Sequence, residues 1–188
     1  MNADYPIALR LEGRVVLVVG GGEVARAKGE ALYAAGAHVR VVAPSVCEAL
    51  AERAHSVERR GFRASDVRGA WFVVAAATPA VNARVHRAAE RAQRFVVAVD
   101  DPAACSATGM ALVRRAGMTV GISTGGAAPA LASLVRRGLD ALLPDELEAW
   151  TALAVRERGG WKAGAVPMAQ RTPALLRALN ALYLAESA

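Results

Sequence analysis

The sequence is poor in the side chains that build disulfide frameworks or metal centres. It holds two cysteines and three histidines in 188 residues. Cys47 and Cys105 lie far apart and match no spacing of a zinc or redox motif. His38, His55 and His86 also stand at unrelated spacings. We therefore expect these histidines to be structural or solvated, and we predict no metal ion held by the protein.

Aromatic side chains and long apolar runs are scarce as well. Phe, Trp and Tyr make up 5% of the chain, although hydrophobic residues make up 54%. No run approaches the roughly 20 apolar residues of a transmembrane helix. Residues 1–5 do not open the pattern of a signal peptide, which needs a basic start followed by an apolar stretch. We therefore expect a cytoplasmic protein.

Acidic residues are fewer than basic residues in this chain. The chain has 23 Lys and Arg against 17 Asp and Glu, which gives a formal net charge of +6. Such a charge favours a polyanionic partner, either nucleic acid or an acidic small molecule. The arginines are scattered and no aromatic-basic motif of an RNA-binding protein is present. We therefore favour an acidic small molecule and expect no nucleic-acid or membrane partner.

Apolar runs alternate with helical patterns over the first hundred residues. Most of these runs are uninterrupted and rich in β-branched residues, as in strands buried on both faces of a parallel sheet. This alternation predicts an α/β fold with a Rossmann-type doubly wound parallel sheet. The predicted strands are 15–19, 38–42, 57–62, 71–76 and 95–99, and the predicted helices are 23–35, 45–55 and 81–92.

The pattern changes after Pro102, and we divide the chain into residues 1–103, 104–144 and 145–188. In the middle part, two short strands are followed by a long helix that ends before Pro144. The last part reads as a small helical domain. The predicted elements are strands 110–115 and 118–122 and helices 123–143, 146–158 and 173–185.

A glycine-rich turn follows the first predicted strand. Residues 20–25 fit the pattern G-x-G-x-x-A between a strand and a helix. Gly20 permits the tight turn, Gly22 lets the backbone approach a pyrophosphate, and Ala25 allows the helix to pack closely on the strand. The helix N-terminus adds positive potential. The pattern predicts a dinucleotide site, and a tight turn that binds nothing is the alternative.

One element of that fingerprint is missing. An acidic residue about 20 positions further on usually binds the ribose hydroxyls of NAD. Here the end of the second strand reads Val42-Ala43-Pro44-Ser45. Ser45 can bond a ribose hydroxyl, but nothing rejects a 2′-phosphate. The motif leaves NAD and NADP open.

Two further segments are candidates for chemistry. Asp100 and Asp101 follow a buried strand at its carboxyl end, where open α/β folds bind ligands. A carboxylate there suits a general base that removes a proton as hydride leaves, although Asp-Asp-Pro is equally ordinary turn chemistry. The segment 123–126 is a second strand–loop–helix junction.

In that junction, Thr124 can cap the helix, while Ser123, Gly125 and Gly126 keep backbone N–H groups accessible. Such a loop is suited to cradle a carboxylate of a ligand. A capped turn without a ligand is an equally good interpretation.

Taken in order, several separated segments resemble the precorrin-2 dehydrogenase family, the module that occurs alone or ahead of a methyltransferase in sirohaem synthases. The resemblance covers about residues 5–144. The matching segments are Tyr5–Ile7 with Leu9 and Leu11, Val16–Lys28, Ala34–Ala37, Val41–Pro44, Ala76–Thr78 with Asn82, Val99–Pro102 with Cys105, Ile122–Gly126, Pro129–Ala132 and Leu142–Pro144.

The resemblance implies a homodimer with a Rossmann domain, a central dimerisation region and a small helical C-terminal domain. It implies oxidation of precorrin-2 to sirohydrochlorin with NAD⁺ and, in some members, insertion of ferrous iron as a second substrate. A polycarboxylate tetrapyrrole substrate suits the basic chain. No methyltransferase segment follows, so we expect that step elsewhere.

The resemblance also assigns roles to individual residues. The family's catalytic aspartate falls on Asp100. The family tolerates Ala-Pro after the second strand, which favours NAD as the cofactor. Its dinucleotide contacts fall on Gly22, Glu23, Val24, Pro44, Ser45 and Thr78.

Several departures from the family pattern keep the substrate and the chelation step open. Residues 106–110 replace a usually apolar segment, Arg114 stands where some members carry an acid, and the loop 78–80 is short. One alternative is a divergent paralogue that oxidises another acidic substrate. A second is a non-catalytic sensor that responds to NAD.

Overall fold

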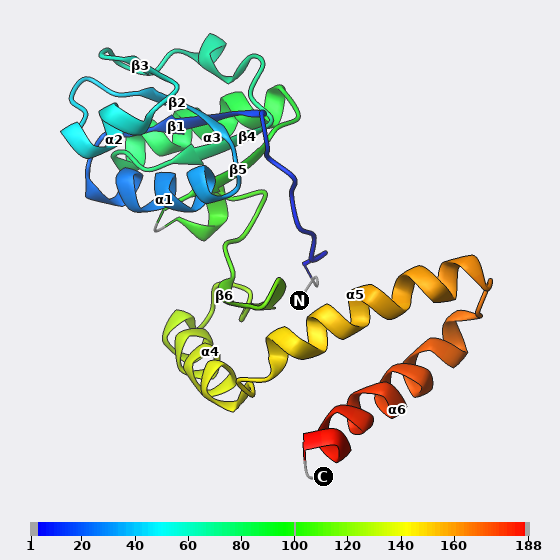
Figure 1. The fold of residues 1–188 in the computed structure, drawn as a ribbon. Helices are drawn as coiled ribbons and strands as arrows, with labels where there is room; N and C mark the ends of the chain where they lie inside the picture. Colours follow the sequence, from blue (N-terminus) through cyan, green and yellow to red (C-terminus); the bar gives the residue numbers. More distant parts are fainter. Residues whose placement is uncertain (1–3, 100, 187–188) are drawn as a thin grey trace. The chain divides into compact units, whose positions relative to one another are not determined.

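The computed structural model describes residues 4–99 and 101–186. The chain divides into two compact units, residues 1–109 and residues 110–188 (Figure 1). Each unit has its own secondary structure, and none of the helices described is long and apolar enough to cross a membrane.

The first unit is built on a five-stranded sheet with the order β3-β2-β1-β4-β5. All neighbouring strands run parallel, which confirms the predicted doubly wound sheet. The strands are β1 (Val15–Val19), β2 (His38–Val42), β3 (Ser56–Glu58), β4 (Phe72–Ala75) and β5 (Phe95–Ala98). The connecting helices are α1 (Glu23–Ala34), α2 (Glu48–Arg53) and α3 (Pro79–Arg91), with short 3₁₀ helices η1 (Ala64–Val67) and η2 (Pro102–Ala104).

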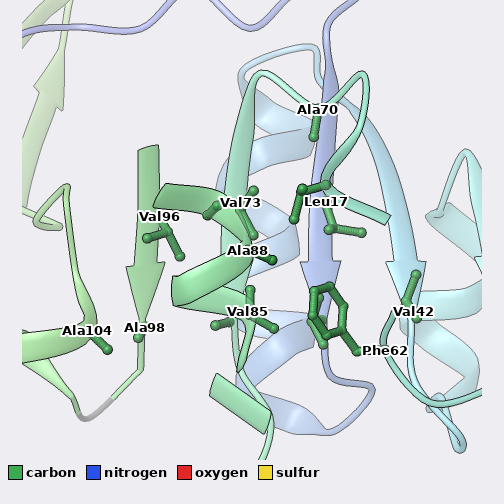
Figure 2. Packing of buried hydrophobic residues seen from close by; sticks show 14 residues of the cluster. Leu17, Val42, Phe62, Ala70, Val73, Val85, Ala88, Val96, Ala98 and Ala104 are labelled. Carbon is green, nitrogen blue, oxygen red and sulfur yellow. The ribbon is translucent and has the colours of Figure 1, made fainter. Parts of the chain in front are cut away.

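Helices cover both faces of this sheet. On one face, Ala25 and Leu32 of α1 and Leu50 of α2 join the buried cluster beneath the strands. On the other face, α3 supplies Val85 and Ala88, which Figure 2 shows packed towards strand residues of the second cluster. The sheet is therefore the middle layer of three.

Strand β1 shows why the apolar runs are uninterrupted. Leu17 and Val19 belong to the cluster under α3, and Val16 and Val18 belong to the cluster under α1 and α2. Side chains alternate between faces along a strand, so a strand covered on both sides needs apolar residues at every position. All four side chains are at most 2% exposed.

The predicted helix 45–55 is too long, because α2 spans only Glu48–Arg53. Residues before it are held by the glycine turn: the Cys47 N–H donates to the Gly21 carbonyl oxygen at 2.8 Å. The predicted strand 57–62 is likewise too long, because β3 comprises only Ser56–Glu58.

The second unit begins with an antiparallel hairpin of β6 (Ala111–Arg115) and β7 (Met118–Ile122). Its turn residues Ala116 and Gly117 have φ values of 50° and 75°. Two positive φ values give the twist that favours a two-residue hairpin connection. Both predicted strands are confirmed.

Three helices follow: α4 (Pro129–Leu142), α5 (Leu147–Ala163) and α6 (Met168–Glu186). The prediction that the first of them starts at Ser123 is wrong. Gly125 and Gly126 have φ values of 60° and 81°, which a right-handed helix does not allow, so α4 begins at Pro129. The other two helices are longer than predicted, and Trp150 Nε1 donates to the Tyr183 hydroxyl at 2.8 Å between them.

Candidate functional site: a dinucleotide cleft at the carboxyl edge of the sheet

The turn after β1 requires glycine at Gly20. Its φ is 132°, and a Cβ there would lie 2.1 Å from the Ala76 carbonyl oxygen after β4. No side chain fits at that distance. The Gly20 N–H donates to the Val42 carbonyl oxygen at 3.1 Å, so the turn is tied to the ends of both neighbouring strands.

Gly21 is the packing glycine of the turn. A Cβ there would lie 1.9 Å from the Ser45 carbonyl oxygen and 2.7 Å from the Val46 Cα. The sequence pattern treats this position as variable, so its role was missed. Only the approach of the segment after β2 reveals it.

Gly22, unlike Gly20 and Gly21, has space for a side chain. A Cβ there would have nothing within 4 Å, and Gly22 is the N-cap residue of α1 with extended backbone. The first N–H groups of α1, which follow this residue, have no partner within the helix. This turn therefore fits a pyrophosphate, which binds helix N-termini through those N–H groups.

A cleft of about 280 Å³ opens beside the turn. In the strand order observed here, β1 and β4 are neighbours whose chains leave the sheet towards opposite faces. That switch point is where open α/β sheets bind ligands. The cleft is lined by Val24, Ala76, Ala77, Pro79, Asn82, Val99 and Asp101.

Asn82 holds one wall of the cleft. Its side chain is 3% exposed, and its Oδ1 accepts the Ala77 N–H at 3.0 Å. The backbone N–H of Asn82 donates to the Thr78 carbonyl oxygen at 2.8 Å. The predicted contact residue Thr78 is the N-cap of α3, and Pro79 takes the first helical position. Asn82 thereby fixes the loop that carries Thr78.

The turn after β5 also lines the cleft. Asp101 lines the cleft, and its carboxylate accepts the Ala104 N–H at 3.3 Å as the cap of η2. Cys105 steadies the same turn, because its Sγ accepts the Ala98 N–H at 3.1 Å. The predicted catalytic Asp100 lies outside the described residues, so its role stays a prediction.

Three further predicted dinucleotide contacts lie in the segments that follow β2 and β1. Pro44 and Ser45 are exposed directly after β2. Glu23 is exposed at the start of α1, where its hydrogen bond with Arg26 lowers the pKa of its carboxyl group. The structure therefore brings most of the predicted dinucleotide residues to one edge of the sheet.

The second predicted loop belongs to the second unit. The Gly125 N–H donates to Ser123 Oγ and the Ala128 N–H donates to Thr124 Oγ1, both at 3.1 Å. The prediction that Thr124 caps the helix is wrong, because α4 begins at Pro129 with Ala128 as its N-cap, and Thr124 bonds the turn before the helix instead. The carboxylate-binding role of this loop stays a prediction.

Comparison with known proteins identifies the family. The family described as putative NAD(P)-binding matches residues 7–109. The family described as the sirohaem biosynthesis protein central region matches residues 115–142. The chain belongs to this NAD(P)-binding family of sirohaem biosynthesis proteins. The resemblance drawn from its motifs is confirmed.

Members of this family match nearly the whole chain. Siroheme synthase 3 of Aeromonas hydrophila subsp. hydrophila is 42% identical over 190 residues, covering 98% of this chain and 41% of that protein. Siroheme synthase 1 of Aeromonas salmonicida is 40% identical over the same length, with the same shares. Siroheme synthase of Pseudomonas entomophila is 42% identical over 166 residues, 85% of this chain and 36% of that protein. The chain thus spans about two fifths of the length of these curated relatives.

A solved structure shows the same fold. The structure of SirC, precorrin-2 dehydrogenase, matches with a TM-score of 0.74 and 24% sequence identity. The match covers 93% of this chain and 88% of that one. Among the residues of this chain that the structure describes, no group of three or more His, Cys, Asp or Glu side chains is placed to hold a metal ion.

Proposed function

We propose that this chain oxidises precorrin-2 to sirohydrochlorin with NAD⁺. One observation carries the proposal: a glycine turn of the dinucleotide-binding kind leads into α1, and Val24 of that helix lines, together with Asp101, a cleft of about 280 Å³. The family match to sirohaem biosynthesis proteins supports the choice of substrate.

The proposed reaction needs only precorrin-2 and NAD⁺ as reactants. Precorrin-2 loses two hydrogens, one as hydride and one as a proton, giving sirohydrochlorin, NADH and H⁺. Bound NAD⁺ supplies the carbon that accepts the hydride. The turn from Gly20 to Gly22 holds the pyrophosphate against α1, and Asn82 fixes the loop that borders the cleft.

We assign the proton to Asp100, the second residue after β5 in the sequence, which would act as general base. The loop 123–126 would bind a carboxylate of the substrate through its free backbone N–H groups. Ferrous iron, if inserted into the product, would be a second substrate held by the nitrogens of the macrocycle.

A direct assay tests the proposal. Enzymatically prepared precorrin-2 is incubated anaerobically with the chain and NAD⁺, and the absorbance of NADH and of the macrocycle is followed. Sirohydrochlorin and NADH should appear together. Parallel reactions with ferrous ion test the chelation step by the further shift of the macrocycle spectrum.

Asp100→Asn provides the decisive variant. It should abolish turnover while NADH still binds, since the amide keeps the shape of the side chain but cannot accept the proton. An Asp100→Asn variant with full activity would refute the assigned base. If the unmodified chain binds NADH but does not oxidise precorrin-2, the result would favour a non-catalytic sensor that responds to NAD. If it oxidises a different acidic substrate, the result would favour a divergent paralogue of the family.

A further inference from the structure

We propose that Arg59 forms a subsite for the 2′-phosphate of NADP, so that the cleft accepts both nicotinamide dinucleotides. The inference rests on the proposed dinucleotide site. It concerns the adenosine end of that site, which the glycine turn does not determine.

The end of β2 lacks the group that would exclude a 2′-phosphate. In NAD-selective sites, an acid at this position binds the ribose hydroxyls and repels a phosphate. Here β2 ends at Val42 and is followed by Ala43, Pro44 and Ser45. Pro44 and Ser45 are exposed, and neither carries a charge.

A guanidinium stands beside this place. The Ala43 N–H donates to the Glu58 carbonyl oxygen at 3.2 Å, so the residue after β3 lies next to the residues that follow β2. That residue is Arg59. Its Nη1 donates to the Val46 carbonyl oxygen at 3.3 Å, which anchors the exposed side chain over the segment that follows Ser45.

Three nearby acids, Glu58, Asp66 and Glu23, are already paired with other arginines. Arg60 Nη2 bonds the Glu58 carboxylate and lies 2.8 Å from Asp66 Oδ1. The Glu23 carboxylate is bonded by Arg26. Among the residues that the structure describes, Arg59 has no carboxylate partner.

Arg59 is therefore suited to a phosphate. A guanidinium presents several N–H donors in one plane, and the bond to Val46 uses only part of them. Charge-assisted bonds from arginine to phosphate are among the stronger hydrogen bonds in proteins. NAD carries a hydroxyl where NADP carries this phosphate, so Arg59 should matter more for NADP.

The test uses the full chain and the fluorescence of NADH and NADPH, without a tetrapyrrole. The unmodified chain should bind both. Arg59→Ala should weaken NADPH binding about tenfold or more relative to NADH, the loss expected for one charged hydrogen-bond donor. Arg59→Lys should keep part of the preference, because it retains the charge without the planar fork.

Arg94→Ala is the matched control. Arg94 is exposed directly before β5, at the amino edge of the same sheet, and its loss removes the same charge from the same unit. It should leave the ratio of the two affinities unchanged.

Each outcome decides the inference. If NADH binds and NADPH does not, or if Arg59→Ala weakens both equally, the 2′-phosphate subsite is refuted while the proposed dehydrogenase survives. If neither nucleotide binds to the unmodified chain, the proposed function fails with it. A changed ratio for Arg59→Ala with an unchanged ratio for Arg94→Ala supports the subsite.

Discussion

At the scale of single residues, the site depends on three adjacent glycines that do different things. Gly20 and Gly21 are packed against backbone atoms of neighbouring segments, whereas Gly22 borders open space. The first and third roles follow from the G-x-G pattern in the sequence. The second does not, because it depends on where the segment after β2 lies, and no local pattern reports that distance.

Gly22→Ala and Gly21→Ala should separate folding from binding. Gly22→Ala should fold with nearly unchanged thermal stability, since its Cβ meets nothing, but should weaken NADH binding about tenfold or more by occupying the approach to the pyrophosphate. Gly21→Ala should unfold at a markedly lower temperature, because its Cβ would lie 1.9 Å from the Ser45 carbonyl oxygen. Calorimetry and NADH fluorescence measure the two effects.

Asn82 offers a second prediction at this scale. Asn82→Ala removes the acceptor of the Ala77 N–H, and leaving a part-buried donor unpaired costs about 1–3 kcal/mol. We expect that loss in chemical denaturation together with weaker NADH binding, since the loop before α3 is released. Asn180→Ala, an exposed position of α6, is the control. Equal stability of the two variants would contradict the wall-fixing role of Asn82.

At the scale of elements, the strands of the sheet could be predicted because burial on both faces leaves an unbroken apolar run. The clearest case is β1, which was expected over 15–19 and spans Val15–Val19. The first residues of the helices are harder to predict from the sequence. The start of α4 depends on the backbone conformation of Gly125 and Gly126, and that of α2 depends on a bond from Cys47 to the glycine turn.

Leu17→Ala should test whether the buried core of the sheet stabilises the unit that carries the site. Leu17 is fully buried in the cluster under α3, and truncation of such a leucine costs roughly 2–5 kcal/mol. Urea denaturation should show this loss. A variant at the exposed Leu176 of α6 should lose far less. Similar losses at the two positions would contradict the buried core assigned to β1.

At the scale of the whole molecule, the Rossmann-type unit and the helical tail could be predicted from the sequence, and the family from the ordered motifs. The association of copies follows only from the family resemblance, because no local pattern in the sequence reports an interface. The exposed residues Leu131, Leu134 and Val135 share one face of α4, as residues three and four apart do. The predicted homodimer, with the central region as its interface, remains a proposal that this apolar face supports.

Leu134→Glu should therefore weaken the homodimer. Leu134 is 57% exposed, so the substitution disturbs no core packing, but a charge on that face would be desolvated by a second copy. Analytical ultracentrifugation should find a dimer for the unmodified chain and mostly monomer for the variant. Exposed Arg158→Glu in α5 is the control for added negative charge. A monomeric unmodified chain would refute the dimer.

The central claim is that a dinucleotide in the glycine-turn cleft receives hydride from a tetrapyrrole. Its most direct measurement is the stoichiometry of a single anaerobic turnover with limiting precorrin-2. We predict one NADH for each sirohydrochlorin formed by the unmodified chain, and about tenfold slower formation of both products by Gly22→Ala at a subsaturating NAD⁺ concentration. Sirohydrochlorin formed without NADH, or at an undiminished rate by Gly22→Ala, would contradict the account.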